Sequence, residues 1–241
     1  CTITLVSCGD DEKQEIYSLS FEKGYYERPL LGAKNIPVRG GNRDYTVTVQ
    51  NTDVLSIDID LSSPIDMGNL VVKPKQKGET TITVKDNVTN ETVDLKIKIV
   101  DSYLNLKVAH PAQVPYTGGE NLFFINNSDR DFYLFDEKME KKECTGNYQF
   151  LIKNSTCYMI LNFDKELNDK STYEYNISNT SERMFTLIEI LLGIDWNMKT
   201  DLINRSTRSA SPVTMNAVDT ETNIIQYFVA GSNDIPENIL D

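Results

Sequence analysis

The chain has 241 residues, of which 39% are hydrophobic and 25% charged, which is enough apolar material for two modest cores and argues against a disordered chain. The formal net charge is −12 and no basic stripe is present, so we expect no nucleic-acid partner, because a negative surface repels phosphate backbones. No apolar run approaches the roughly 20 residues that a membrane-spanning helix needs.

The first 15 residues contain a candidate lipid-attachment site. The segment 5–8, LVSC, resembles a bacterial lipobox, in which a small residue precedes the cysteine that takes up a diacylglycerol. The resemblance implies lipidation at Cys8, with residues 1–7 as the remnant of a signal peptide. Residues 8–15 are acidic after the cysteine, as in the export signal of Bacteroidetes surface lipoproteins, and would form a solvated tether. The alternative is an unmodified Cys8 in a frayed terminus.

Residues 16–101 show the alternation of apolar and polar residues that is typical of strands with one buried face. The clearest examples are residues 45–50, 55–61 and 93–99. Turn-forming residues such as Gly40-Gly41 separate the strands. Short strands at this regular spacing predict a β-sandwich.

Two segments of this region resemble a known family. Residues 78–86, GETTITVKD, are similar to the signature strand of bacterial immunoglobulin-like (Ig-like) group 2 domains, and residues 51–58, NTDVLSID, to a turn leading into a core strand. The resemblance covers residues 30–101. It implies an Ig-like β-sandwich without the paired cysteines of antibody domains, acting as a spacer or adhesive unit. Fold alone does not define function.

Residues 102–241 contain several strand candidates and one helix. The helix is predicted over residues 182–192, where a wide apolar face calls for burial against a sheet, although a membrane or partner helix is the alternative. Asn179 with Glu182 resembles a capping box, and Gly193 is a helix stop. We therefore predict a mixed, β-rich α+β domain with one buried helix. The strand candidates are residues 103–108, 121–126, 131–135, 147–153, 157–163, 173–177, 213–218 and 224–230.

The chain offers little catalytic chemistry. His110 is the single histidine, and no Gly-x-Ser-x-Gly elbow, phosphate-binding loop or zinc-ligand spacing is present, so we assign no catalytic residue, metal or cofactor and expect a non-enzyme. Segments 58–60 and 126–131 are rich in side-chain oxygens, which are the ligands that calcium prefers. Calcium binding there is therefore one alternative, and simple exposure to solvent is the other. Aromatic residues could stack on sugar rings, with core packing as the alternative; they are Tyr25-Tyr26, Tyr133 and Tyr173–Tyr175.

Cys144 and Cys157 are the two cysteines of the second half. An exported protein meets an oxidising compartment, so a disulfide between them is one alternative and two thiols the other. Counted from the predicted hairpin turn at residues 154–156, Cys157 faces Ile152 rather than Cys144.

The whole pattern predicts an exported lipoprotein. An aromatic stretch at residues 131–135 and an Asp-Trp pair at 195–196 resemble uncharacterised Bacteroidetes lipoproteins with an Ig-like first half. We expect a non-catalytic binding or structural module, attached by an N-terminal lipid anchor to the outer membrane at the cell surface, with a glycan or protein ligand. The alternative is a carbohydrate-active hydrolase or a glycan-binding accessory subunit of a glycan-uptake system. The oligomeric state stays open.

Overall fold

The computed structural model describes residues 15–140, 142–196 and 213–240. The predicted lipidation site Cys8 and nearly all of the predicted tether therefore lie outside the described residues. The chain forms two compact units, one made of Cys1–Tyr26 and Lys34–Lys98, the other of Glu27–Ala33 and Ile99–Asp241. Residues 27–33, which the sequence placed in the first domain, belong to the second unit, where Leu30 N–H donates to the carbonyl of Val100 at 2.9 Å.

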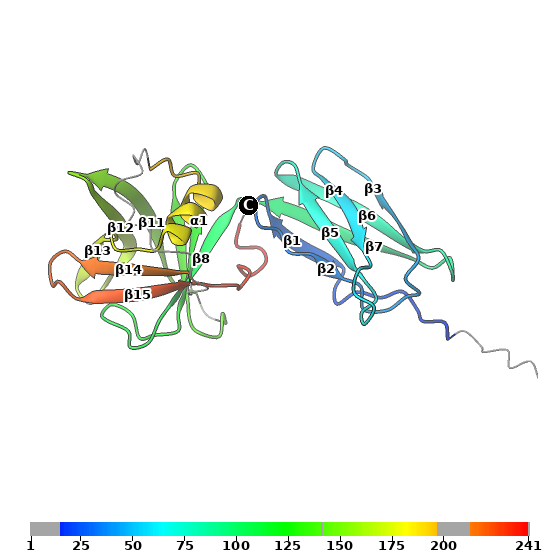
Figure 1. Cartoon of the computed structure of the whole chain (residues 1–241), viewed down its shortest axis with the longest axis horizontal. Coiled ribbons are helices and arrows are strands. Elements are labelled where there is room, and N and C mark those ends of the chain that lie inside the picture. Colours follow the sequence, from blue (N-terminus) through cyan, green and yellow to red (C-terminus); the bar gives the residue numbers. More distant parts are fainter. Residues whose placement is uncertain (1–14, 141, 197–212, 241) are drawn as a thin grey trace, which may run out of the picture. The chain divides into compact units, whose positions relative to one another are not determined.

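Residues 25–100 form two small β-sheets, and most of the residues in these sheets belong to the first unit (Figure 1). The core of this unit follows the predicted alternation: Ile82 and Val84 in one sheet and Leu70 and Val72 in the other are buried, whereas their sequence neighbours are more exposed. One sheet has the order β1-β7-β6-β3, with β1 (Tyr25–Pro29), β7 (Thr92–Val100), β6 (Gly78–Asp86) and β3 (Tyr45–Val49). The other has the order β2-β5-β4, with β2 (Ile36–Pro37), β5 (Asn69–Pro74) and β4 (Leu55–Asp60).

The second unit is a closed antiparallel barrel of eight strands, each paired with its neighbours in sequence and the last, β15, paired with the first, β8. All eight predicted strands are present. The expectation of a mixed α+β domain is corrected in one respect, because the strands close on themselves and leave no sheet edge. They are β8 (Tyr103–Val108), β9 (Asn121–Ile125), β10 (Asp131–Phe135), β11 (Lys142–Lys153), β12 (Thr156–Leu167), β13 (Lys170–Asn176), β14 (Thr214–Asp219) and β15 (Ile225–Ala230).

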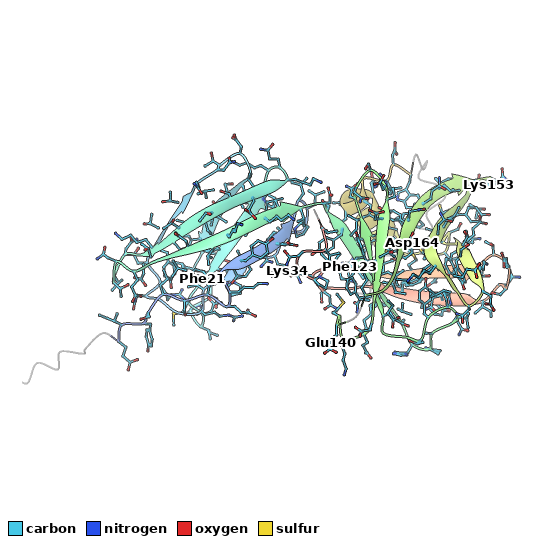
Figure 2. The ribbon with its side chains drawn as sticks, turned by 180° about the vertical axis from the view of Figure 1, so that it is seen from behind. Phe21, Lys34, Phe123, Glu140, Lys153 and Asp164 are labelled. Atoms are coloured by element: carbon cyan, nitrogen blue, oxygen red, sulfur yellow. The ribbon has the colours of Figure 1, made fainter. Side chains whose placement is uncertain are left out.

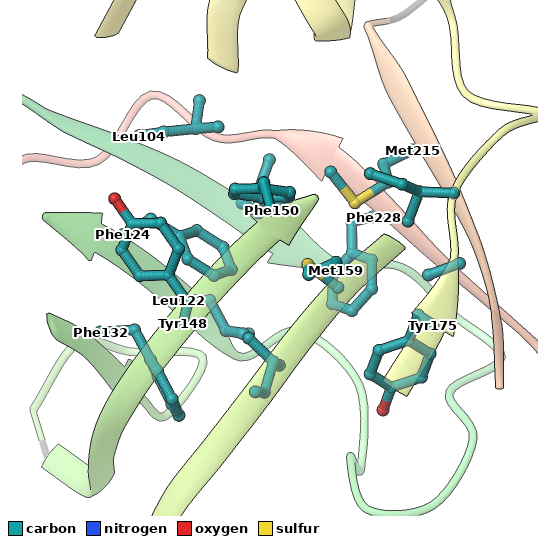
Figure 3. Packing of buried hydrophobic residues seen from close by; sticks show 14 of the residues in the cluster. Leu104, Leu122, Phe124, Phe132, Tyr148, Phe150, Met159, Tyr175, Met215 and Phe228 are labelled. Atoms are coloured by element: carbon teal, nitrogen blue, oxygen red, sulfur yellow. The ribbon is translucent and has the colours of Figure 1, made fainter. Parts of the chain in front are cut away.

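Aromatic side chains fill much of the barrel interior (Figure 3). The rings of Phe124 and Tyr148 meet edge to face with centroids 5.0 Å apart, and Phe132 and Phe163 do so at the same distance. Such contacts stabilise beyond the area that they bury. Away from the barrel ends, the interior is therefore a packed core rather than a channel.

The helix α1 (Glu182–Leu192) follows β13 and has the bounds that the sequence predicts. Its buried residues Met184, Phe185, Ile188 and Leu192 join the core of the barrel, so the prediction of a buried helix is confirmed. None of the helices in the described part of the chain is long and apolar enough to cross a membrane.

The ends of the helix confirm one predicted cap and correct the other. Gly193 adopts the left-handed conformation (φ 62°), and its N–H donates to the carbonyl of Glu189, as expected of a C-cap. The N-cap is Ser181 and not Asn179: Ser181 is extended, and its hydroxyl accepts a hydrogen bond from Met184 N–H at 3.4 Å. The capping-box pattern therefore misplaced the cap by two residues.

The up-and-down order of the strands gives the barrel two distinct ends. Helix α1 connects β13 to β14 at one end, where Arg130 donates to the carbonyl of Leu192 at 2.5 Å. The opposite end carries the connections that include residues 109–120, 136–140, 168–169 and 220–224. Figure 2 shows Glu140, in one of these connections, on the opposite side of the unit from Lys153, the last residue of β11. We call the end without the helix the open end.

Candidate functional site

A pocket of about 210 Å³ lies at the open end of the barrel. Its residues come from three segments that are far apart in sequence: the β8–β9 connection, the start of β13 with the turn before it, and the β14–β15 hairpin. Barrel mouths are common positions for small-ligand sites. The pocket is lined by Gln113, Val114, Asn168, Lys170, Tyr173, Tyr175, Asp219, Glu221, Thr222, Ile224 and Gln226.

Tyr173 and Tyr175 form the aromatic wall of the pocket. Both side chains point inward from β13, because residues two apart in a strand share a face, and their rings stack with centroids 6.3 Å apart. The Tyr173 hydroxyl donates to the carbonyl of Leu167 at 2.6 Å, and the Lys170 ammonium lies 4.8 Å from the Tyr173 ring centroid. Tyr173 is thus held in place by contacts within the chain.

The hydroxyl of Tyr175 is the buried polar group of this wall that lacks a hydrogen bond of full geometry. The side chain is only 1% exposed, and its hydroxyl interacts with that of the nearby Tyr116, but among the described residues neither hydroxyl makes a hydrogen bond of full geometry. Burial raises the pKa of both phenols well above 10, so both stay protonated at neutral pH. Figure 3 shows the Tyr175 hydroxyl directed away from Met215, which lies near the helix end of β14.

Asp219 is the buried carboxylate of the pocket, at 8% exposed. One oxygen, Oδ1, accepts hydrogen bonds from Glu221 N–H at 3.0 Å, Thr222 N–H at 2.8 Å and the Thr222 hydroxyl at 3.0 Å. Burial acts to raise the pKa of Asp219, but these hydrogen bonds outweigh it and leave the pKa below its ordinary value. Asp219 is therefore ionised at neutral pH.

The turn built by Asp219 has a counterpart in the first unit. Residues 86–90 and 219–223 share the pattern Asp-x-x-Thr-Asn, and in both the aspartate Oδ1 accepts two backbone N–H groups. Both end on an asparagine with positive φ, 62° at Asn90 and 59° at Asn223. The repeated pattern is the sequence signal that could have located this hairpin.

Polar contacts hold the rim of the pocket together. Gln226, which is buried, accepts a hydrogen bond from Gln113 N–H at 2.7 Å and donates to the carbonyl of Tyr227, which fixes the β8–β9 connection to β15. Lys170 forms an ion pair with Glu221 at 2.8 Å, which joins β13 to the β14–β15 hairpin.

The aromatic residues considered for sugar stacking are mostly held by other groups. Tyr26, Tyr173 and Tyr175 are buried, as in the core-packing alternative, and Tyr133 is half-buried with the Lys142 ammonium 5.4 Å from its ring centroid. Tyr25 is half-buried. The pocket walls therefore offer ring edges and hydroxyls rather than open ring faces.

Cys144 and Cys157 are buried thiols and are not joined to each other. The register confirms that Cys157 lies opposite Ile152, while Cys144 pairs with Leu134 of β10. Ile152 lies eight positions after Cys144 in β11, roughly 25 Å along a strand, which is far beyond the reach of a disulfide.

The remaining sequence candidates are engaged elsewhere. His110 is exposed in the β8–β9 connection, beside Gly118. In the segments considered for calcium, Asp58 pairs with Lys73, and Asp131 accepts a hydrogen bond from Asn127 at 2.6 Å. In the described ranges no three His, Cys, Asp or Glu side chains gather as a metal site would require.

Comparisons with known proteins add little. No family model matches the sequence, and no curated protein matches it. Among solved structures, domains 5–6 of the S-layer protein SbsC align with a TM-score of 0.30 and 14% identity, over 66% of this chain and 88% of that one. Domains 4–9 of the same surface layer protein align with a TM-score of 0.31 and 11% identity, over 90% of this chain and 31% of that one. Likeness this weak assigns neither a fold family nor a function.

Proposed function

We propose that this chain is a non-catalytic, membrane-tethered binding module in which the barrel carries the ligand site and the first unit is a spacer. The observation that carries the proposal is the pocket at the open end of the barrel. It combines a partly apolar lining, a few convergent polar groups, the buried Tyr175 hydroxyl without a hydrogen bond of full geometry, and Asp219, whose Oδ2 accepts no hydrogen bond from the described chain. These are the properties of small-ligand sites.

The spacer role rests on an Ig-like assignment for the first unit. Strand β3 pairs with β6, while the β4–β5 hairpin that separates them in sequence belongs to the other sheet. A chain that leaves one sheet and returns to it in this way is typical of sandwiches with Greek-key connections. The resemblance of residues 78–86 to the Ig-like signature strand supports the same assignment.

The tether rests on the lipobox-like segment 5–8 and the acidic residues that follow it. Lipidation at Cys8 would place both units at the outer face of a membrane, at the cell surface. Mass spectrometry of the protein from its native membrane tests this step. We expect a new N-terminus at Cys8 carrying acyl chains; an unmodified Cys8 that still follows residues 1–7 would rule the anchor out.

The alternative, a carbohydrate-active hydrolase, is supported by one observation, namely that Asp219 and Glu221 line the same pocket. A glycosidase needs one carboxyl group that stays protonated near neutral pH, which requires a raised pKa. Asp219 has a lowered pKa, and Glu221 is largely exposed and ion-paired with Lys170. The binding role therefore fits the pocket better than hydrolysis.

A pair of neighbouring substitutions tests the site. Ile224 lines the pocket and is 46% exposed, whereas Ile225 is 40% exposed and lies outside the lining. Ile224→Trp should fill the pocket, and Ile225→Trp is the matched control. Saturation-transfer NMR on the full chain, with a panel of neutral sugars, amines and carboxylates, should reveal a saturable ligand that Ile224→Trp abolishes and Ile225→Trp retains. Binding by no panel member, or binding unchanged in Ile224→Trp, would contradict the proposal.

A further inference from the structure

The second carboxylate oxygen of Asp219 distinguishes the pocket hairpin from its counterpart. In the first unit Asp86 uses both oxygens, because Oδ2 accepts from the backbone N–H and the side-chain amide of Asn42, at 2.8 and 2.9 Å. In the described part of the chain, Asp219 Oδ2 has no such donor. Asp219 Oδ2 is open to the pocket, where water or the donor of a ligand can reach it.

The charges around the pocket favour a positively charged ligand over a negatively charged one. Its lining holds two carboxylates, Asp219 and Glu221, and one cation, Lys170. The charge of Lys170 is offset locally by Glu221 at 2.8 Å and by the Tyr173 ring. Asp169 adds further negative charge near Tyr173. Lys170 also offsets part of the Asp219 charge, but the lining as a whole stays negative, so it repels an anion and favours a cation.

The mouth of the pocket is apolar. Val114 is 71% exposed and Ile224 is 46% exposed, and the two side chains line the pocket from different connections. Exposed aliphatic side chains beside a carboxylate suit a ligand with a polar head and a short hydrocarbon body. The hydroxyl of Tyr175, which lines the pocket, can accept or donate one further hydrogen bond there.

We infer that the pocket binds a small organic cation, a primary ammonium group on a short apolar body, with the ammonium on Asp219 Oδ2 and the body between Val114 and Ile224. The inference rests on the proposed binding function and adds the class of ligand. An amine in solution and the side chain of a lysine share this chemistry, so the probes must include both.

Isosteric probes test the inference on the full chain. n-Butylammonium, 1-butanol and butyrate have the same hydrocarbon body and differ in charge, while N-acetyl-lysine methylamide represents a lysine side chain. We expect n-butylammonium to bind at least about tenfold more tightly than 1-butanol and butyrate, because a hydrogen bond to a charged group is lost in both. Tighter binding of the lysine derivative than of n-butylammonium would identify the source as a peptide.

Two variants locate the ammonium. Asp219→Asn should weaken n-butylammonium binding at least about tenfold, and Tyr175→Phe, which keeps the ring, should weaken it roughly two- to tenfold. Asp53→Asn removes one exposed carboxylate from the other unit and should leave binding unchanged. Pocket binding of glucose or butyrate in place of n-butylammonium, sensitive to Ile224→Trp, would overturn the cation inference and leave the binding function standing. Equal binding by Asp219→Asn and the unsubstituted chain would also overturn it.

Discussion

The backbone N–H of Gln113 donates to the side-chain carbonyl of Gln226 at 2.7 Å. Gln226 is a buried residue of β15, so this hydrogen bond holds the β8–β9 connection, the longest described connection at the open end, against the barrel. The same glutamine donates to the carbonyl of Tyr227 at 2.7 Å. Because the connection supplies Gln113 and Val114 to the pocket, one side chain links the stability of the barrel to the shape of its site.

Replacing Gln226 by leucine should therefore destabilise the barrel. The change leaves the Gln113 N–H without its acceptor in a partly buried connection, and the loss of this hydrogen bond costs about 0.5–1.5 kcal/mol. Chemical denaturation followed by tryptophan fluorescence can report the loss, since Trp196 packs in the barrel core. Gln149 is an exposed glutamine on β11, and Gln149→Leu serves as the control, with a change close to zero expected. Equal stability of the two variants would contradict the anchoring role.

The two helix-cap candidates can be separated by substitution. Ser181→Ala removes the acceptor for Met184 N–H and the donor to the carbonyl of Thr214, and should cost about 1–2 kcal/mol. Asn179→Ala should cost little, because the Asn179 side chain is exposed and its contact with Asn216 uses only the backbone carbonyl. Thermal melts of the two variants give the comparison. A larger loss for Asn179→Ala would restore the cap that the sequence pattern predicts.

The paired hairpins predict unequal effects of the same substitution. Asp86→Asn places an amide group where Oδ2 accepts two hydrogen bonds from Asn42, and should cost about 1–3 kcal/mol at pH 7. Asp219→Asn should cost less, because the described chain uses only Oδ1 of that residue. Denaturant midpoints of the two variants give the measurement, and a larger loss for Asp219→Asn would refute the assignment of its second oxygen.

The cost of Asp86→Asn should also depend on pH. The pKa of Asp86 is lowered in the folded state, because hydrogen bonds from Asn42, Val88 and Thr89 outweigh the opposing effect of burial. A depressed pKa stabilises the fold above the ordinary value of 3.8 and loses this contribution as the pH falls through the lower folded value. The difference in stability between the chain and Asp86→Asn should therefore shrink below about pH 4, as unfolding titrations at pH 7 and pH 3 can show.

The two buried thiols predict a simple labelling pattern. In a chain with Cys1→Ser and Cys8→Ser, two thiols should react with iodoacetamide after denaturation, because no bridge joins Cys144 to Cys157. In the folded chain labelling at pH 8 should be slow, since burial, with help from Glu143 and Asp164, raises the pKa of Cys144 to about 11. A native mass 2 Da below that of the reduced chain would reveal a disulfide and contradict the register.

Local features of the fold follow from the sequence. Alternation predicts β8 and β10 with the observed bounds and the other barrel strands to within a few residues, and the wide apolar face predicts α1. These predictions succeed because alternation and helical periodicity report which face of a single element is buried. The cap at Ser181 was missed because two nearby polar residues can each serve as a cap, and only the backbone conformation chooses between them.

Closure of the barrel and the pocket were decided only by tertiary structure. Phe228 pairs with Val108, 120 positions away, and the pocket unites Gln113, Lys170 and Asp219. Backbone hydrogen-bonding groups are the same in every strand, so alternation cannot say which strand is the neighbour of which. The long-range contacts that join β15 to β8 select that pairing, and only then do distant polar residues meet around one cavity.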